Sequence, residues 1–505
     1  MYHGIDSVIS TTSRSRAPTC LLGVVVAFLA TGHSQAFSAA HSFTSSKNGR
    51  RSATALGVVR RRHVLTTAAA ALSASSSASA SETGTASVLP TNQVVRTVQG
   101  IRHKRLGGMN TKKDSIVVSE MGLGTQRWMS TDFNAPDRDL CFEMLDRAIL
   151  HGGINLIDTA EQYPIPSGGS TSREGATEEV IGDWMRERKV ARDKVVIATK
   201  ITGGRHVTPG NIRRDCEESL QRLGTDMIDV YQLHWPQRYS PQSNWGQSLM
   251  YNIDNEKYWR AGQGEPTSFP ALCQAMQELI DDGKIRSWGL CNDNAYGLTA
   301  STRTAAALGT TPPCCLQGDF SLVDRKSEEN GVAEAASPYN ENVGFLSYNA
   351  LAGGMLTGKY SQGDPAAPDT PNRLRALALL TQPRGRMDTR GWGGTLYRYR
   401  TTAVQEAIVE YQRIVDEHRK EVSSLTELAL RWNRQRSLVT STLVGHSSLE
   451  QLEESLAHFR NPKPLSTEIM WEIDRVHMRN RLPIFSSDRV GADWYGEGEI
   501  GETIP

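Results

Sequence analysis

The sequence lacks the features that mark several large classes of protein. Its 56 lysines and arginines are balanced by 55 aspartates and glutamates, so no overall field attracts a nucleic acid or an acidic surface. Its seven cysteines include no CxxC pair and no Cys/His cluster, which argues against a disulfide scaffold and against a zinc site. The adjacent Cys314 and Cys315 are interpreted as strand core. We therefore expect a small-molecule partner, no bound metal and no nucleic acid.

Acidic residues are absent from one long stretch of the chain. Between Asp6 and Glu82 there is none, while Arg, Ser, Thr and Ala abound, which is typical of targeting segments. The apolar run 21–30 is too short to span a bilayer and precedes a small-residue site before Phe37, so it predicts a secretory signal peptide. The stretch from about 38 to 57 resembles a transit peptide.

A third targeting element follows at Arg60-Arg61-Arg62 and ends near Ala80. It resembles a twin-arginine thylakoid signal, and a second piece of ordinary transit peptide stays open as the alternative. We predict that residues 1–93 are a targeting leader without folded structure and that the protein is imported into a plastid (chloroplast). Stroma and thylakoid lumen both stay open, and no membrane span is expected in the mature protein.

Residues 94–505 lack a GxGxxG turn after the first apolar strand, because Gly122-Leu123-Gly124-Thr125-Gln126-Arg127 has no third glycine. This argues against an open doubly wound sheet. Eight apolar strands alternate with helical patterns, which predicts parallel pairing and closure into a (β/α)₈ TIM barrel with a C-terminal extension. The expected strands are one near Val118 running to Thr125, then 154–158, 195–200, 227–234, 285–291, 313–320, 343–348 and 438–444. The expected helices are 138–151, 177–188, 208–223, 270–282, 294–308, 331–339, 401–419 and 448–460.

Two connections, after strands four and seven, are longer than usual and suggest functional loops. The first, 235–269, contains Trp245, Tyr251 and Trp259, which are expected either to line an apolar substrate pocket or to pack within the loop. The second, 349–400, contains seven arginines and suits closure over an anion.

Four polar side chains stand at or after the ends of neighbouring predicted strands: Asp158, Tyr163, Lys200 and His234. A barrel brings the carboxyl ends of its strands to one rim, so the four are expected to meet there. A lysine beside a tyrosine favours phenolate and is expected to lower the phenol's pKa, while the aspartate keeps the lysine charged. The set predicts a proton donor to a carbonyl oxygen. The hydride for the carbonyl carbon must come from a cofactor.

Several stretches around these residues resemble the aldo-keto reductases, nearest to the bacterial Tas-type branch that is related to the potassium-channel β subunits. They are Asn155-Leu156-Ile157-Asp158-Thr159-Ala160-Glu161-Gln162-Tyr163, Ala198-Thr199-Lys200, the run 222–238 containing His234-Trp235-Pro236-Gln237-Arg238, and Leu356-Thr357-Gly358-Lys359-Tyr360. The resemblance covers about 117–476. It implies an NADPH-dependent reductase in which Asp158, Tyr163, Lys200 and His234 are the catalytic tetrad.

The resemblance also implies cofactor contacts. Asn292 and Gln317 match positions that hold the nicotinamide amide, and Tyr348 matches the aromatic position at the nicotinamide face. Cys291 stands where Ser is usual, which weakens one hydrogen bond. Arg398 is the choice for the 2′-phosphate partner.

The remaining implied contacts lie further along the cofactor. Leu351, Gly354, Leu356 and Lys359 fall in the pyrophosphate loop, and Gly445, Ser447, Gln451 and Glu454 match the adenosine segment. That segment opens a predicted helix, where N-terminal amides can meet phosphate. Ser455 stands where Asn is usual, which puts contacts to the adenine edge in doubt.

Two functions follow from these residues. The first is NADPH-dependent reduction of an aldehyde or ketone to an alcohol, with Tyr163 as proton donor and Trp235 and Trp245 as substrate contacts. The second is an NADPH-binding redox sensor or regulatory subunit with slow or no turnover. Intact catalytic residues occur in both kinds of protein, so turnover is what separates them.

Overall fold

The computed structural model describes residues 89–108, 115–165, 173–241, 251–261, 265–360, 385, 387, 397–399, 401–481 and 483–485. All of them belong to one compact unit that the chain forms from Glu82 onward. The targeting elements predicted within 1–88 lie outside the described residues. The described chain begins ahead of Val94, and its first residues contact the barrel: Thr91 N donates to Asn342 Oδ1 at 2.7 Å, and Asn92 Nδ2 donates to Ser437 O at 2.9 Å.

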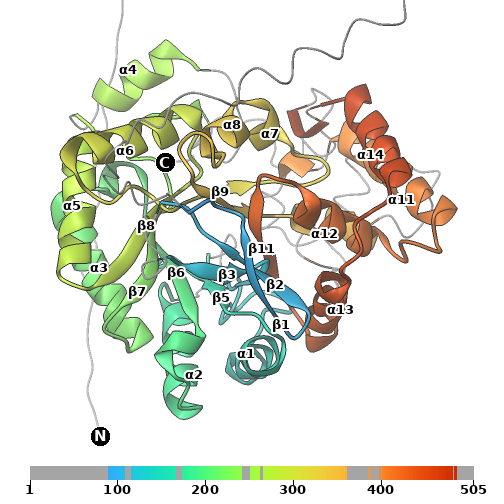
Figure 1. Cartoon of the computed structure of the whole chain (residues 1–505), viewed down its shortest axis with the longest axis horizontal. Coiled ribbons are helices and arrows are strands. Elements are labelled where there is room, and N and C mark those ends of the chain that lie inside the picture. The colour runs from blue at the N-terminus through green and yellow to red at the C-terminus, as the bar shows by residue number, and fades with distance from the viewer. Residues whose placement is uncertain are drawn as a thin grey trace, which may run out of the picture. The chain divides into compact units, whose positions relative to one another are not determined.

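The centre of the fold is a closed barrel of eight parallel strands surrounded by helices (Figure 1). In barrel order from the first, the strands are β4 (Met121–Gly124), β5 (Leu156–Asp158), β6 (Val196–Ile201), β7 (Ile228–Leu233), β8 (Ile285–Cys291), β9 (Cys315–Asp319), β10 (Gly344–Tyr348) and β11 (Val439–Gly445). β11 pairs with β4 and closes the barrel. The predicted (β/α)₈ architecture is confirmed.

Apolar side chains fill the barrel interior, as strands that are buried on both faces require. Leu156, Val230 and Leu346, from three different strands, belong to this inner cluster and are fully buried. Cys314 and Cys315 belong to it too, which supports the interpretation of the pair as strand core. A larger apolar cluster packs the outer faces of the strands against the helices.

Several helices begin where the sequence offers a side chain that caps them. Thr208, Ser268 and Asn294 each accept a hydrogen bond from a backbone N–H in the first turn of the helix that follows. The helices of the layer next to the first six strands are α1 (Arg138–Leu145) with its π-helical continuation η1 (Asp146–His151), α2 (Ala176–Glu187), α3 (Pro209–Leu223), α5 (Phe269–Asp281), α6 (Ala295–Leu308), α7 (Lys326–Glu329) and α8 (Val332–Ala336). Short 3-10 turns are η2 (Arg192–Lys194), η3 (Gly204–His206), η5 (Ala352–Thr357), η7 (Tyr397–Tyr399) and η8 (Pro483–Phe485).

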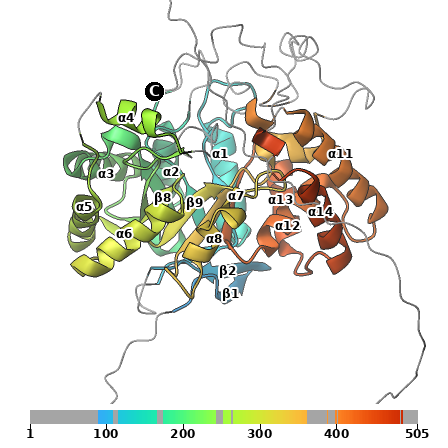
Figure 2. The same ribbon diagram turned by 90° about the horizontal axis from the view of Figure 1, so that it is seen from above.

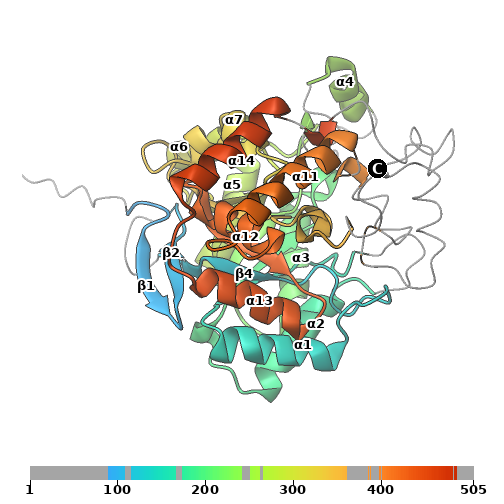
Figure 3. The ribbon, with the colours of Figure 1, turned by 90° about the vertical axis from the view of Figure 1, so that its right-hand side faces the viewer.

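The helix that covers β11 is not the one predicted. The expected helix 401–419 exists as α11 (Thr402–Glu417), but it packs against α14 (Thr467–Arg479) on the outside of the molecule (Figure 3). The helix against β11 is α12 (Leu425–Gln435), followed after β11 by α13 (Leu449–Arg460). α12 is buried on nearly every side although its sequence is amphipathic, and its buried Arg431 donates to backbone carbonyls. One helix, 401–419, was expected between the last two barrel strands, so α12 was not predicted.

The expected first strand is also divided in two. Val117–Ser119 forms β3, which pairs antiparallel with β2 (Ile101–Arg105), and the barrel strand β4 begins only after Glu120. β2 in turn pairs with β1 (Val94–Val98), a hairpin that the sequence did not predict. The hairpin lies at the end of the barrel where the strands begin (Figure 2), because Lys104 Nζ donates to the carbonyl of Val439, the first residue of β11.

The connection after β7 contains a helix, α4 (Ile253–Ala261), which has no buried residue. Among the described helices, none combines the length and the apolar character needed to cross a lipid bilayer.

Candidate active site

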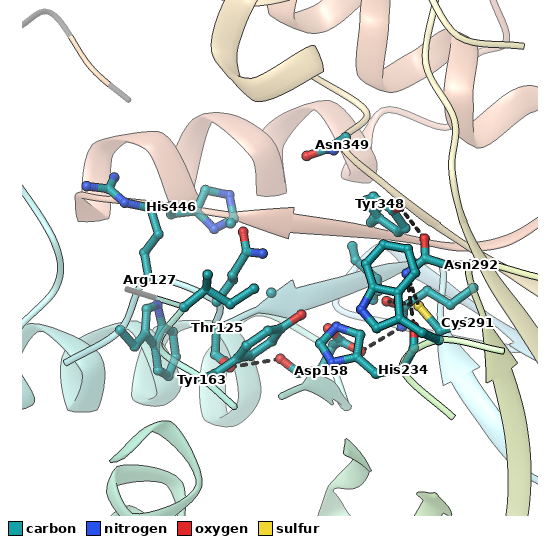
Figure 4. A pocket seen from close by; sticks show the side chains of 18 of the residues that line it. Thr125, Arg127, Asp158, Tyr163, His234, Cys291, Asn292, Tyr348, Asn349 and His446 are labelled. Carbon is teal, nitrogen blue, oxygen red and sulfur yellow. Dashed lines mark hydrogen bonds between the residues drawn. The ribbon is translucent and has the colours of Figure 1, made fainter. Parts of the chain in front are cut away.

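A pocket opens at the ends of the barrel strands (Figure 4). Its lining residues lie at or after the ends of every barrel strand except β6. It holds about 1030 Å³ of space between its atoms, part of it open to solvent. The lining residues are Gly124, Thr125, Gln126, Arg127, Trp128, Asp158, Tyr163, Ile165, His234, Trp235, Cys291, Asn292, Gln317, Tyr348, Asn349, Arg398, Leu443, Gly445, His446 and Ser447.

Lys200 does not line the pocket itself but contacts two residues that do, Asp158 and Tyr163, and it is fully buried near the end of β6. Its ammonium group donates to Asp158 Oδ2 at 2.8 Å and to Thr159 O at 2.8 Å, and it lies 3.5 Å from Tyr163 Oη. Burial alone would lower the pKa of Lys200, but the attraction of Asp158 and Tyr163 outweighs it and the net pKa is raised. The lysine therefore stays charged inside the barrel, as predicted.

Tyr163 stands beside this charge, and its hydroxyl belongs to the pocket wall. Here the sequence-based expectation of a lowered phenol pKa is wrong. Burial raises the pKa of Tyr163 by more than Lys200 lowers it, so the net pKa lies above its ordinary value. The physical reason is that Tyr163 is nearly inaccessible and the phenolate loses its solvation there. Tyr163 is therefore a neutral phenol across the physiological range, with a proton to donate.

His234 follows β7 and reaches the same pocket. Its ring meets the ring of Tyr163 edge-on, with centroids 5.6 Å apart, so both can address one substrate atom. Burial, with a smaller contribution from the charge on Lys200, lowers the pKa of His234 well below its ordinary value. The imidazole is therefore neutral. The structure thus brings all four predicted catalytic residues, Asp158, Tyr163, Lys200 and His234, to one rim.

The residues matched to the nicotinamide lie next to this group. Gln317 Nε2 donates to Asp158 Oδ1 at 2.8 Å, so the cofactor position and the tetrad share one hydrogen-bond network. Asn292 has a left-handed backbone (φ 57°), donates to His234 O at 3.0 Å and accepts from Tyr348 Oη at 2.5 Å. Cys291 lies within 3.6 Å of Gln317 Oε1 as a weak donor, and burial raises the pKa of its thiol to about 12.

The residues matched to the pyrophosphate loop do not line this pocket. Leu351, Gly354 and Leu356 lie in or next to η5, and Leu356 is fully buried in the outer core. Lys359 follows, with its ammonium 5.1 Å from the centre of the Tyr360 ring. Gly354 has a φ of 99°, a conformation that favours glycine, and the side chains of Lys359 and Tyr360 pack against it.

Arg398, chosen for the 2′-phosphate, lies in the pocket wall but is already paired. Its Nη2 donates to Asp319 Oδ2 at 2.7 Å, and Tyr399 Oη donates to the same oxygen at 2.6 Å. Both charged side chains are almost fully buried. Arg398 is therefore held by an internal carboxylate beside Asn349, which donates to Asp319 as well.

The adenosine segment contributes Gly445 and Ser447 to the pocket. Gln451 supports it from behind by accepting a hydrogen bond from Ser447 N at 2.9 Å. Glu454 is half exposed on α13 and pairs with His458 at 3.5 Å. Gln451 and Glu454 do not line the pocket.

Of the aromatic residues predicted to contact substrate, Trp235 lines the pocket and stacks on His234 at 6.1 Å. Trp245 lies outside the described residues. Tyr251 is 59% exposed, and Trp259 packs under the guanidinium of Arg205 at 3.9 Å. Neither of the last two lines the pocket, because α4 lies apart from the barrel core and buries none of its residues.

The loop after β4 supplies pocket-lining residues that the sequence did not single out. Thr125, Arg127 and Trp128 line the pocket, and so does His446 after β11. Each of them lies just after the end of a barrel strand, and this position in the sequence could have predicted that they line the pocket.

The sequence model of the aldo/keto reductase family matches residues 120–477, well over half of the chain. The chain belongs to this family. Protein tas of Escherichia coli strain K12 is 32% identical over 385 residues, which cover 73% of this chain and 97% of that protein. An aldo-keto reductase of Babesia bovis is 33% identical over 305 residues, 58% of this chain and 98% of the relative. Aldo-keto reductase YhdN of Bacillus subtilis strain 168 is 30% identical over 254 residues, 49% of this chain and 62% of the relative.

The family assignment confirms the resemblance and makes this aldo-keto reductase an oxidoreductase. Members of the family in general reduce carbonyl groups with NAD(P)H, and the buried Tyr163 and Lys200 pair is the part of the pocket that suits this chemistry.

Proposed function

We propose that the protein reduces an aldehyde or ketone to the corresponding alcohol with NADPH. The observation that carries the proposal is the position of Lys200, whose ammonium contacts Asp158 and lies 3.5 Å from the hydroxyl of Tyr163 at the pocket wall. A charged lysine beside a neutral phenol makes a proton donor whose conjugate base is stabilised as it forms.

Two separate parts of the pocket lining carry polar groups that suit one nicotinamide dinucleotide. Amide groups of Asn292 and Gln317 stand beside the tetrad, where they would hold a carboxamide. Elsewhere in the lining, Arg127 Nε and His446 Nδ1 are buried polar atoms without a hydrogen-bond partner among the described residues. When bound, a reduced nicotinamide supplies the hydride to the carbonyl carbon.

The side chains of this chain then act on the carbonyl oxygen. Tyr163 donates its O–H to that oxygen and transfers the proton as the carbon receives the hydride, so the product is the alcohol. Lys200 stabilises the phenolate that Tyr163 becomes, and Asp158 keeps Lys200 charged. The neutral His234 orients the oxygen by hydrogen bonding.

Replacing Tyr163 by Phe tests the proton-donor role. We expect NADPH oxidation with a panel of aldehydes to fall by about a hundredfold or more, the usual contribution of a positioned acid. Tyr231→Phe is the matched control, because Tyr231 is a fully buried tyrosine whose hydroxyl has no partner among the described residues. A loss below tenfold in Tyr163→Phe would remove Tyr163 from this role. A cofactor oxidised only once per protein and not exchanged would favour the sensor over the enzyme.

The pocket wall supports apolar substrates. Trp128, Ile165 and Trp235 line it, whereas Tyr251 and Trp259, the aromatic residues expected from the sequence, do not. Aromatic or extended apolar carbonyls should therefore be reduced with higher kcat/KM than short polar ones. Equal kcat/KM for benzaldehyde-type and short polar aldehydes would contradict this.

We propose plastid import for the protein on the composition of residues 7–81, which contain no acidic side chain. N-terminal sequencing of the mature protein tests it. A start near Phe37 or Gly57 fits the stroma, and one near Ser81 fits the thylakoid lumen. An uncleaved chain would contradict import.

A further inference from the structure

The first turn of α2 contains two polar side chains, Thr177 and Glu178, that are fully buried. A glutamate is almost never fully buried unless it is paired. The helix also lacks a side-chain cap, because Gly175 stands at its N-cap position, whereas α3, α5 and α6 are each capped by the side chain of the preceding residue. The polar groups of this turn bind other elements of the fold instead.

The carboxylate of Glu178 joins a barrel strand to a neighbouring helix. Its Oε1 accepts from Thr199 Oγ1 at 2.6 Å, and its Oε2 accepts from Arg222 Nε at 2.6 Å. Arg222 belongs to α3 and supplies the opposite charge that a buried carboxylate needs. Thr199 precedes Lys200 in β6, and side chains alternate between the two faces of a strand. Glu178 therefore binds the neighbour of Lys200 from the helix side of the barrel.

The hydroxyl of Thr177 contacts the segment that carries Tyr163. It donates to Tyr163 O at 3.4 Å and lies 2.8 Å from Thr159 Oγ1. Because a threonine hydroxyl has one hydrogen, the Thr159 hydroxyl is the donor in the second bond. The carbonyl of Thr159 in turn accepts from the Lys200 ammonium at 2.8 Å. Thr177 thus contacts both the backbone of Tyr163 and the residue whose carbonyl holds Lys200.

These contacts converge on one separation that the proposed chemistry uses. The Lys200 ammonium lies 3.5 Å from the Tyr163 hydroxyl, which is longer than a strong hydrogen bond, so their attraction depends on small displacements. Lys200 belongs to β6 and Tyr163 follows β5, and these two strands are paired. The first turn of α2 is bonded to both sides, so it fixes one relative to the other.

We propose that Thr177 and Glu178 are positioning residues that set the separation of the Lys200 ammonium and the Tyr163 hydroxyl. This inference rests on the proposed function. Neither side chain lines the pocket, so both act through the residues that they bind. A proton donor displaced by a fraction of an ångström transfers its proton more slowly, while the dinucleotide binds as before.

Replacing threonine by valine removes a hydroxyl with little change of shape and tests the two contacts separately. We expect Thr177→Val and Thr199→Val each to lower kcat for an aldehyde by about ten- to a hundredfold, and to change the Kd of NADPH, measured by calorimetry, by less than about twofold. The solvent deuterium isotope effect on kcat should increase, because proton transfer becomes slower relative to the other steps. Thr177→Ser keeps the hydroxyl and should retain the kcat of the wild type.

Thr442→Val is the matched control. Thr442 is a fully buried threonine of β11 whose Oγ1 donates to Asn433 Oδ1 of α12 at 2.8 Å, so it also joins a barrel strand to a helix. We expect this variant to lose stability in urea unfolding as the other two do and to keep its kcat. A crystal structure of Thr177→Val should show the Lys200 ammonium further from the Tyr163 hydroxyl than 3.5 Å.

An equal fall of kcat in Thr442→Val would overturn the assignment, because any lost strand-to-helix bond would then have the same effect. An unchanged kcat in Thr177→Val, an unchanged isotope effect, or a serine variant as slow as the valine variant would overturn it as well. If Thr177→Val does not fold, Thr199→Val decides by the same criteria. A wild-type chain that reduces no carbonyl would refute the proposed function itself, whereas an active wild type with an equally active Thr177→Val would refute only the positioning role.

Discussion

Two buried lysines stand at opposite ends of the barrel and have opposite electrostatics. Lys200, at the rim where the strands end, contacts Asp158 at 2.8 Å, and its pKa is raised. Lys104, from β2 at the end where the strands begin, donates to Val439 O at 3.0 Å and forms no ion pair among the described residues. Burial lowers the pKa of Lys104 from 10.5 to about 8.

The difference shows that burial alone does not decide the charge of an internal lysine. A carboxylate in contact compensates for the lost solvation, and a carbonyl oxygen does so only in part. At the rim the compensated charge lies 3.5 Å from the hydroxyl of Tyr163, where the proposed chemistry uses it. At the opposite end the lysine helps to attach the β1–β2 hairpin to the barrel, where residues of this fold contribute to stability.

The largest expected effect is at the rim. Lys200→Met should lower kcat/KM by about a hundredfold or more, because the phenolate of Tyr163 loses its stabilising charge. It should also destabilise the fold by roughly 3 kcal/mol, since Asp158 stays buried without its cation. NADPH oxidation and urea unfolding measure the two effects. Lys104→Met is the matched control, and an equal loss of kcat/KM in both variants would remove the distinction between the two ends.

The second effect depends on pH. Between pH 8 and 10.5 the unfolded chain holds a proton on Lys104 that the folded chain has released, so the stability of the wild type rises with pH in that window. Relative to Lys104→Met, the free energy of unfolding should increase by about 3 kcal/mol from pH 7.5 to 10.5. Urea unfolding at several pH values measures the slope, and Lys420→Met, at an exposed position, gives the baseline. A flat difference would contradict the lowered pKa.

A smaller effect is expected where two loops of the rim are joined. Arg238 donates to both oxygens of Asp293, at 2.9 and 2.6 Å, and thereby holds the loop after His234 to the loop after Asn292. Arg238→Lys cannot form both bonds, so kcat/KM should fall by about tenfold. The control is the exposed Arg303, which pairs with Glu341, and Arg303→Lys should leave activity unchanged.

The smallest effect concerns the opposite end. Asn92 donates to Ser437 O at 2.9 Å and accepts from Thr440 Oγ1, and its φ is 62°. Asn92→Ala should lower the free energy of unfolding by about 1–2 kcal/mol and leave kcat unchanged. Thermal unfolding and steady-state kinetics measure the two quantities. A fall in kcat without a loss of stability would mean that this end takes part in the chemistry.

The fold was largely predictable because its signals are local. Apolar strands such as 228–233 and capped helices such as α3 carry their pattern within a dozen residues. The prediction missed α12, although its sequence is amphipathic, because a single helix was expected between the last two barrel strands and 401–419 filled that place. It also joined β3 to β4, because only Glu120 separates the two strands.

The site was predictable in part for the same reason. Asp158, Tyr163, Lys200 and His234 follow strand ends, so the barrel had to bring them together. Arg398 donates to Asp319, and Arg127 donates to Ser447. Both partners lie far along the chain from the arginine, so no local sequence pattern indicates these pairs.

The sequence by itself determined the family, the barrel and the four residues at its rim, because strand periodicity and strand-end positions are local properties. Only the tertiary structure decided which charges are paired and which polar groups stay protonated. The phenol of Tyr163 has a raised pKa because the folded chain removes its water, and Lys200 keeps its charge because folding places Asp158 against it. Solvation and charge pairing are set by residues that meet only after folding.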